Sequence, residues 1–377
     1  MSMFKWRGEN TPESGKNLRR VAALFALPVV AVAFIAGCGS DDSGSDSEGD
    51  EAGLTATKTY LTEHSADLAA ETAKIKTAAS AYYDLAKAED FDYDKLLKNQ
   101  CEAVDAALTD AKDAFVAANP NYEEMEGIVA GIPRTAQYDT DMDAGSDASD
   151  PESAVSFNLT LPNGETMKQP GNLFFLLETS LYGTNEDLVV KGVKPDVNCD
   201  GKVEFGEGLP DANILKAAAD EMDKQANDLD TDAQEIVINE SDAFTAITVM
   251  TPTMSEYFEQ WKNSAFVSGQ GEQDEASFVA TSRLSDIADI LTGINFTYEE
   301  IEPVIAAENA DQAEQTAAEL SDLLARAEDL RDREAGGEKF TPEQADQLGA
   351  EMQAQAEKIA GQVTQAAKDT GVEIQEA

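Results

Sequence analysis

The sequence predicts an all-α protein of duplicated helical bundles, with a small β-hairpin and a calcium-loop insertion in the first half. From Ala56 onward, Ala, Leu, Glu, Asp and Gln dominate, and apolar residues recur at spacings of three and four, as on one face of a helix. The pattern continues over most of the chain. We expect helices at about 56–88, 92–118, 120–131, 168–183, 211–232, 240–265, 274–293, 298–333 and 342–368.

An internal similarity supports the duplication. Tyr122–Ala130 reads YEEMEGIVA, and Tyr298–Ala306 reads YEEIEPVIA. Chance similarity in a chain rich in Ala and Glu is the alternative. Two copies of one four-helix-bundle-like unit fit the length, so we expect a helical domain at 56–377 with halves at about 56–235 and 236–377.

Three local signals suggest helix boundaries. Thr341–Gln344 (TPEQ) combines a capping Thr, Pro at the first helical position and Gln three residues after the cap. Thr297–Glu300 (TYEE) has the spacing of a second capping box. Gly336–Gly337 predicts a break between two helices.

One stretch in the first half is not helical in character. The chain between residues 134 and 170 is acidic and rich in Gly and Ser. Within it, Ser156–Leu161 alternates polar and apolar residues and is followed by Asn163-Gly164. The alternation and the Asn-Gly turn predict a small β-hairpin.

Residues Asp196–Glu207 (DVNCDGKVEFGE) match a twelve-residue calcium-binding loop. Gly201 is at the sixth position, where the backbone turns sharply, and Val203 is the apolar residue that such loops tuck inward. Ca²⁺ takes six to eight hard oxygen ligands. The expected ligands are Asp196, Asn198, Asp200, Lys202 through its carbonyl, Glu204 and Glu207. The alternative, an acidic surface turn, leaves Gly201 and Glu207 as coincidences.

The N-terminus resembles the signal peptide and lipobox of bacterial lipoproteins. A basic start precedes the apolar run Val21–Gly37, which is short for a membrane span, and Cys38 follows it directly. We expect residues 1–37 to be removed and acyl chains such as palmitate on Cys38 to anchor the protein outside the cytoplasmic membrane. After Cys38, the chain to about Gly53 is mostly Gly, Ser, Asp and Glu with no large apolar residue, which predicts a flexible acidic tether at 38–55.

The charge restricts the partners. The formal net charge is −47, which argues against nucleic acid and anionic lipid as partners. It favours cations, or it serves only solubility.

Cysteine and histidine are scarce. Apart from Cys38, the cysteines are Cys101 and Cys199, which could be bridged outside the cytoplasm. His64 is the single histidine, so a zinc site with two or three imidazoles is excluded. We expect His64 to be a surface residue rather than a ligand.

A family resemblance lies in the segment Leu173–Gly183 (LFFLLETSLYG). Together with the lipobox and the duplicated helical body, it is similar to the imelysin-like lipoproteins, which include EfeO-type iron-uptake proteins and insulin-cleaving metallopeptidases. Glu178 and Gly183 match the end of the family's Gly-x-His-x-x-Glu motif. Tyr122–Glu126 and the Asp-rich segment 138–144 resemble two further family segments. The resemblance covers about 56–370.

The family motif is degenerate here. Phe175 stands at the histidine position and Leu173 at the glycine position, and Phe cannot bind a metal ion. Glu178, alone on an apolar helix, could be a remaining ligand or a buried carboxylate held by hydrogen bonds.

The resemblance implies a lipid-anchored envelope binding protein for metal or iron acquisition, with an iron permease or other envelope proteins as partners. Its cargo would be an iron or copper ion held by hard oxygen ligands. The candidate residues are Glu123, Glu124, Glu126, Asp139, Asp141, Asp143 and Glu178. The alternative for each is a solvated helix face.

Two other functions compete with this one. The first is a non-catalytic interaction protein whose calcium loop stabilises a binding face. The second is an envelope metallopeptidase, which needs a metal with an open position and a general base, and the missing histidine disfavours it.

Overall fold

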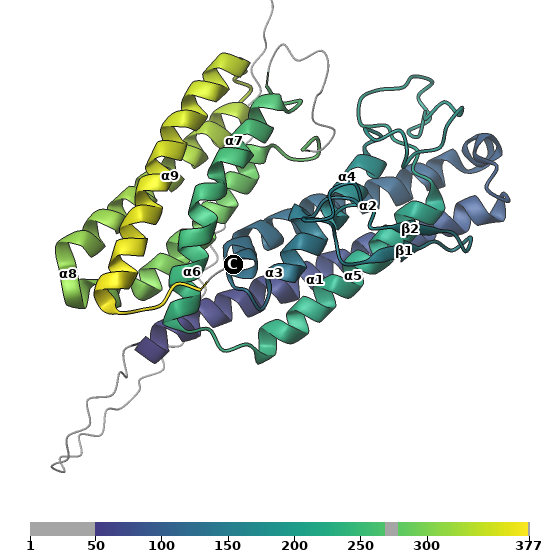
Figure 1. Cartoon of the computed structure of the whole chain (residues 1–377). Helices are drawn as coiled ribbons and strands as arrows, with labels where there is room; N and C mark the ends of the chain where they lie inside the picture. Colours follow the sequence, from purple (N-terminus) through teal and green to yellow (C-terminus); the bar gives the residue numbers. More distant parts are fainter. Residues whose placement is uncertain (1–49, 268–277, 376–377) are drawn as a thin grey trace, which may run out of the picture. The chain divides into compact units, whose positions relative to one another are not determined.

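Long helices form most of the computed structural model, which describes residues 50–267 and 278–375 (Figure 1). The α-helices are α1 (Asp50–Ala88), α2 (Tyr93–Gly131), α3 (Ala136–Asp139), α4 (Leu173–Leu181), α5 (Ala212–Glu235), α6 (Glu240–Met250), α7 (Met254–Asn263), α8 (Arg283–Ala335) and α9 (Pro342–Thr370). Two short helices are η1 (Thr140–Ala144), a π-helix, and η2 (Thr251–Thr253), a 3₁₀-helix. The all-α prediction is confirmed.

The hairpin is also confirmed. Strands β1 (Asn158–Thr160) and β2 (Thr166–Lys168) pair antiparallel, with Leu159 opposite Met167. Gly164 adopts a φ of 91° in the turn between them, which a residue with a Cβ rarely adopts.

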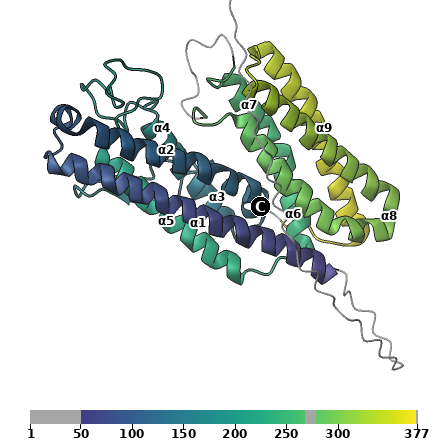
Figure 2. The same cartoon turned by 180° about the vertical axis from the view of Figure 1, so that it is seen from behind.

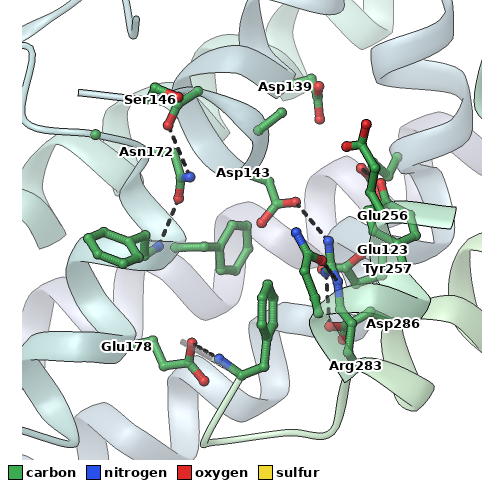
Figure 3. A pocket seen from close by; sticks show the side chains of 18 of the residues that line it. Glu123, Asp139, Asp143, Ser146, Asn172, Glu178, Glu256, Tyr257, Arg283 and Asp286 are labelled. Atoms are coloured by element: carbon green, nitrogen blue, oxygen red, sulfur yellow. Dashed lines mark hydrogen bonds and ion pairs between the residues drawn. The ribbon is translucent and has the colours of Figure 1, made fainter. Parts of the chain in front are cut away.

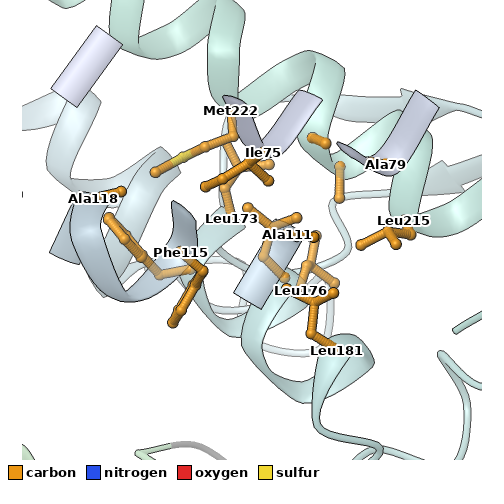
Figure 4. Close-up of a cluster of buried hydrophobic side chains, with 14 of the residues drawn as sticks. Ile75, Ala79, Ala111, Phe115, Ala118, Leu173, Leu176, Leu181, Leu215 and Met222 are labelled. Atoms are coloured by element: carbon orange, nitrogen blue, oxygen red, sulfur yellow. The ribbon is translucent and has the colours of Figure 1, made fainter. Parts of the chain in front are cut away.

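The apolar side chains gather in two clusters. One extends from Leu61 to Ile238 and joins α1, α2, α4 and α5, which lie together in both views (Figures 1 and 2). Figure 4 shows part of it, where Met222 of α5 lies near Ile75 of α1. The other cluster extends from Ala243 to Ala367 and joins α6, α7, α8 and α9.

Several helix boundaries differ from the prediction because packing overrides local signals. Helix α2 continues through Pro120, with the fully buried Ala118 and Tyr122 on either side of it. Thr297 does not cap a helix: it is buried inside α8 and its Oγ1 donates to the Gly293 carbonyl at 2.9 Å. The other capping box is confirmed, since Gln344 N–H donates to Thr341 Oγ1 at 3.3 Å.

Other boundaries move by a few residues. Helix α8 begins at Arg283 instead of residue 274, after an N-cap at Ser282. Helix α4 begins at Leu173 instead of residue 168, because β2 uses the preceding residues and Asn172 caps the helix. The predicted helix 240–265 is interrupted by η2 at Pro252. The break at Gly336–Gly337 is confirmed.

The N-terminal predictions lie mostly outside the described residues. This applies to the signal peptide at 1–37, to Cys38 and to the first part of the tether at 38–55. The end of the predicted tether is helical, because α1 begins at Asp50 and Leu54 packs against the core. No helix in the described parts of the chain is both long enough and apolar enough to cross a membrane.

Helices α2 and α8 cross at very short range. A Cβ on Gly293 of α8 would lie 1.9 Å from the Glu124 carbonyl oxygen of α2. Only glycine allows this approach. The crossing brings the carboxylates of α2 next to the first turn of α8.

Candidate functional site

An acidic cavity of about 540 Å³ lies among α2, η1, α4, α7 and the start of α8 (Figure 3). Phenylalanine rings form part of its wall, namely Phe115, Phe174, Phe175 and Phe278. Of the described residues that line it, Arg283 is the single cation. The carboxyl groups that line it are those of Glu123, Glu126, Asp139, Asp143, Asp147, Asp150, Glu178, Glu256 and Asp286.

Local helix geometry places the central carboxylates. Glu123 and Glu126 are three residues apart on α2, so they share one face of the helix. Asp139 and Asp143 are four residues apart across the junction of α3 and the π-helix η1. Single turns of π-helix are frequent at functional sites. Here η1 brings both aspartates to the cavity.

Arg283 is the centre of the cluster. Its guanidinium contacts Asp286 at 3.0 Å and lies 3.9 Å from both Glu123 and Asp143. It also stacks between aromatic rings, 4.0 Å from the Tyr257 centroid and 4.4 Å from that of Phe278. A buried ion pair needs such close contacts to offset desolvation, and one guanidinium cannot balance all the surrounding carboxylates.

Two glutamates of α2 keep unpaired oxygen atoms. Glu123 and Glu126 are each 1% exposed, and the Oε2 atom of each is buried without a hydrogen-bond partner. Burial raises the pKa of both carboxyls well above the usual range, and the neighbouring carboxylates raise it further. Native proteins seldom leave a buried polar atom unpaired, because the desolvation cost is then not offset. These atoms fit a cation as their missing partner.

The pKa values of Asp139 and Asp143 are also raised. Burial, reinforced by Asp143, raises the pKa of Asp139 to about 7, and the hydrogen bond from Tyr122 opposes the rise. Burial also raises the pKa of Asp143, which Arg283 counteracts. Burial therefore disfavours the charged form of both carboxyl groups, and a nearby cation would stabilise that form.

Glu178 has its oxygens occupied. It accepts backbone N–H groups from Phe278 at 2.8 Å, Val279 at 2.9 Å and Ala280 at 2.8 Å. Burial raises its pKa to about 7, against the effect of these three hydrogen bonds. Of the two roles left open by the sequence, the geometry favours the buried carboxylate held by hydrogen bonds. Phe175, at the family's histidine position, lines the same cavity.

Two residues expected near the site lie elsewhere. Asp141 is buried away from the cavity and accepts from Ser156 N–H and Ser156 Oγ, both at 2.6 Å, so it organises the loop before the hairpin. Glu124 points to another face of α2, where Tyr60 Oη donates to it at 2.9 Å. His64 lies 3.2 Å from Glu124, and its side chain is 19% exposed, so it is only partly at the surface.

Residues important to the cavity were missed by sequence reasoning. Arg283, Asp286 and Tyr257 come from the second half of the chain and join carboxylates of the first half. The spacing of Arg283 and Asp286 on one helix face was the available signal, but such pairs are common on surface helices.

In the predicted calcium loop, side-chain carboxylates accept hydrogen bonds from backbone N–H groups of the same loop. Asp196 Oδ1 accepts from Gly201 N–H at 3.3 Å, and Glu207 Oε2 accepts from Glu204 N–H at 2.6 Å. Gly201 has a φ of 91°, consistent with the sharp turn. Val203 is 45% exposed, so the expected inward position of this side chain is wrong. The loop is irregular, and Phe205 nearby is also exposed.

A disulfide attaches this loop to α2. Cys101 and Cys199 are bonded, with Cα atoms 6.2 Å apart. Lys112 of α2 adds a hydrogen bond to the Gly206 carbonyl at 2.7 Å. In the described residues, no three or more His, Cys, Asp and Glu side chains are arranged to hold a metal ion together. Calcium binding by the loop therefore stays a prediction.

The fold and the cavity define a class: an all-α protein with a buried, carboxylate-rich cavity at a helix crossing. Residues 56–363 match the imelysin family model, which covers most of the chain, and the chain therefore belongs to the imelysin family. Members of this family are extracellular or cell-envelope proteins. A comparison with curated proteins gives no match.

Proposed function

We propose that this protein is a lipid-anchored binding protein of the cell envelope that captures a metal cation, iron in particular, in the acidic cavity. The observation that carries the proposal is the pair of buried, unpaired oxygens, Oε2 of Glu123 and Oε2 of Glu126. A bound cation supplies the partner that both atoms lack.

The donor set favours a hard ion. The carboxylates offer oxygen only, and the imidazole position of the family motif is occupied by Phe175. Oxygen donors suit iron(III) and calcium better than zinc, which favours nitrogen and sulfur ligands in proteins. Copper remains a second candidate cargo. The carboxyl groups of Glu123, Asp143 and Asp286 lie within 4 Å of the Arg283 guanidinium, and those of Glu126 and Asp139 line the same cavity. This excess of negative charge favours a highly charged cation.

Two features of the sequence complete the proposal. Cys38 follows a signal-like apolar run, which supports lipid anchoring at the outer face of the membrane. The spacing of Asp196–Glu207 supports calcium binding. The disulfide between Cys101 and Cys199 would then connect the calcium-bound loop to α2. An envelope permease would receive the cargo.

The test is titration calorimetry of the purified full-length protein with Fe³⁺, Fe²⁺, Cu²⁺ and Ca²⁺. We expect one tight iron site that is lost in Glu126→Gln. The matched control is Glu302→Gln, because Glu302 occupies the corresponding place in the second YEE segment and is only half-buried. Binding of calcium alone would instead favour an interaction protein. Metal-dependent cleavage of casein or insulin chains would favour the peptidase.

A further inference from the structure

The acidic cavity is much larger than a metal ion. Its volume of about 540 Å³ is many times the ~30 Å³ that one water molecule occupies in the liquid, and it falls within the ~300–1,000 Å³ range of pockets for small organic ligands. The cavity therefore has room for an organic ligand.

The carboxyl groups that line the cavity lie at different depths. They extend from the buried Glu123 and Glu126, through the half-buried Asp139 and Asp143, to the exposed Asp147, Asp150 and Glu256. A single ion contacts only carboxylates that meet at one point, whereas a chain with several positive charges contacts carboxylates at several depths. At the deep end, the unpaired Oε2 atoms of Glu123 and Glu126 lack a donor. An ammonium group offers three N–H donors.

Aromatic rings line the same cavity, and Arg283 shows how they accommodate a cation. Its guanidinium lies 4.0 Å from the Tyr257 ring centroid and 4.4 Å from that of Phe278, and it contacts Asp286 at 3.0 Å. The further rings of the wall are those of Phe115, Phe174 and Phe175. Such rings attract cations and pack against the methylene groups of a charged chain.

We propose that the cavity binds a linear aliphatic polyamine. One ammonium group pairs with Glu123 and Glu126, the methylene chain packs along the phenylalanine rings, and a second ammonium group pairs with the exposed carboxylates, such as Glu256. Binding forms no covalent bond and requires no metal ion. It goes beyond the capture of iron, and a polyamine and a metal ion would compete for Glu123 and Glu126.

The experiment is titration calorimetry of the metal-free, full-length protein with spermidine, putrescine and butylamine. Putrescine and butylamine have the same carbon chain but carry two ammonium groups and one, respectively. We expect one spermidine per chain, and putrescine to bind at least about tenfold more tightly than butylamine, because a second ion pair forms. Mg²⁺, a compact divalent cation, serves as the control for general attraction to the acidic surface.

Two variants test the two ends of the binding site. Glu126→Gln should weaken spermidine binding by about thirtyfold, because a buried charge partner is lost. Glu256→Gln should weaken it by about threefold, because this carboxylate is exposed, and should leave iron binding unchanged. The matched control is Glu259→Gln, because Glu259 is exposed on the same helix, pairs with Lys262 and does not line the cavity.

The outcomes separate this inference from the proposed function. Spermidine binding without iron binding supports the polyamine site and overturns the proposed function, and iron binding without spermidine binding does the reverse. Spermidine binding that Mg²⁺ abolishes, or that is unchanged in folded Glu126→Gln, is general attraction to the acidic surface and overturns the inference. Thermal melting shows whether each variant folds. If Glu126→Gln does not fold, equal spermidine affinities of Glu256→Gln and Glu259→Gln overturn the inference.

Discussion

The acidic cavity and the loop Asp196–Glu207 are both rich in carboxylates, but the carboxylates have different hydrogen-bond partners in the two regions. In the loop, carboxylates accept backbone N–H groups of the same segment, as Asp196 does from Gly201. In the cavity, carboxylates from distant segments are buried together, and Glu123 and Glu126 keep unpaired oxygens. The residues of the loop are therefore close together in the sequence, where their spacing can be recognised, whereas the residues of the cavity are brought together only by the fold.

Removal of the buried Arg283 guanidinium should cause the largest loss of stability. Arg283→Met leaves Asp286, Glu123 and Asp143 without their shared cation, and breaking a buried ion pair from one side costs about 3–5 kcal/mol. We expect urea denaturation to show a loss of this size at pH 7. The comparison at the loop is Lys194→Met, because Lys194 lies 3.2 Å from Asp196 and is half exposed. A pair of this kind contributes about 0–1 kcal/mol. Equal losses in both variants would contradict the distinction between the two regions.

The next effect concerns Glu178. Glu178→Gln replaces a carboxylate that accepts three backbone N–H groups from residues 278–280. We expect a loss of about 2 kcal/mol in unfolding free energy, since hydrogen bonds to charged groups contribute more than neutral ones. Iron stoichiometry should stay unchanged, because Glu178 positions the segment before α8 rather than binding the ion. The exposed Glu165→Gln serves as control for stability, and a Glu178→Gln protein that folds normally but binds no iron would make Glu178 a ligand.

Much of the fold could be predicted because its signals are local. Apolar spacing of three and four identified most helices, and the Asn-Gly turn identified the hairpin. The errors occur where tertiary packing decides. Thr297 has the spacing of a cap, but burial of its neighbours Ile294 and Tyr298 keeps α8 continuous through it.

The site could be predicted only in part, for the same reason. The two YEE segments have nearly identical letters, yet Glu123 and Glu126 are buried at the cavity while Glu299 is exposed and Glu302 half-buried. Nothing local distinguishes them. The difference arises from what packs against each segment, and for the first segment this includes Arg283, far away in sequence.

The third prediction is a pH dependence that belongs to the cavity. The pKa values of Asp139 and Glu178 are raised to about 7 in the folded protein, above those of unfolded Asp and Glu near 4. The folded state therefore binds more protons than the unfolded state between about pH 4 and 7, and stability falls as pH rises through this range. We expect the urea midpoint of the metal-free protein to decrease from pH 4.5 to 7. Asp139→Asn should flatten the decrease, and a midpoint that rises with pH would contradict the assignment.

The smallest expected effect is that of calcium on the loop. If Asp196–Glu207 binds Ca²⁺, an ion at ten times its dissociation constant stabilises the folded protein by about 1.4 kcal/mol. We expect thermal melting in Ca²⁺ to exceed that in a chelator by a few degrees. Glu207→Gln should abolish the difference because it removes the bidentate ligand, and Glu126→Gln should keep it. The reverse pattern, with the calcium effect lost in Glu126→Gln and kept in Glu207→Gln, would place calcium in the cavity. The loop would then be an acidic turn whose carboxylates serve only its own backbone.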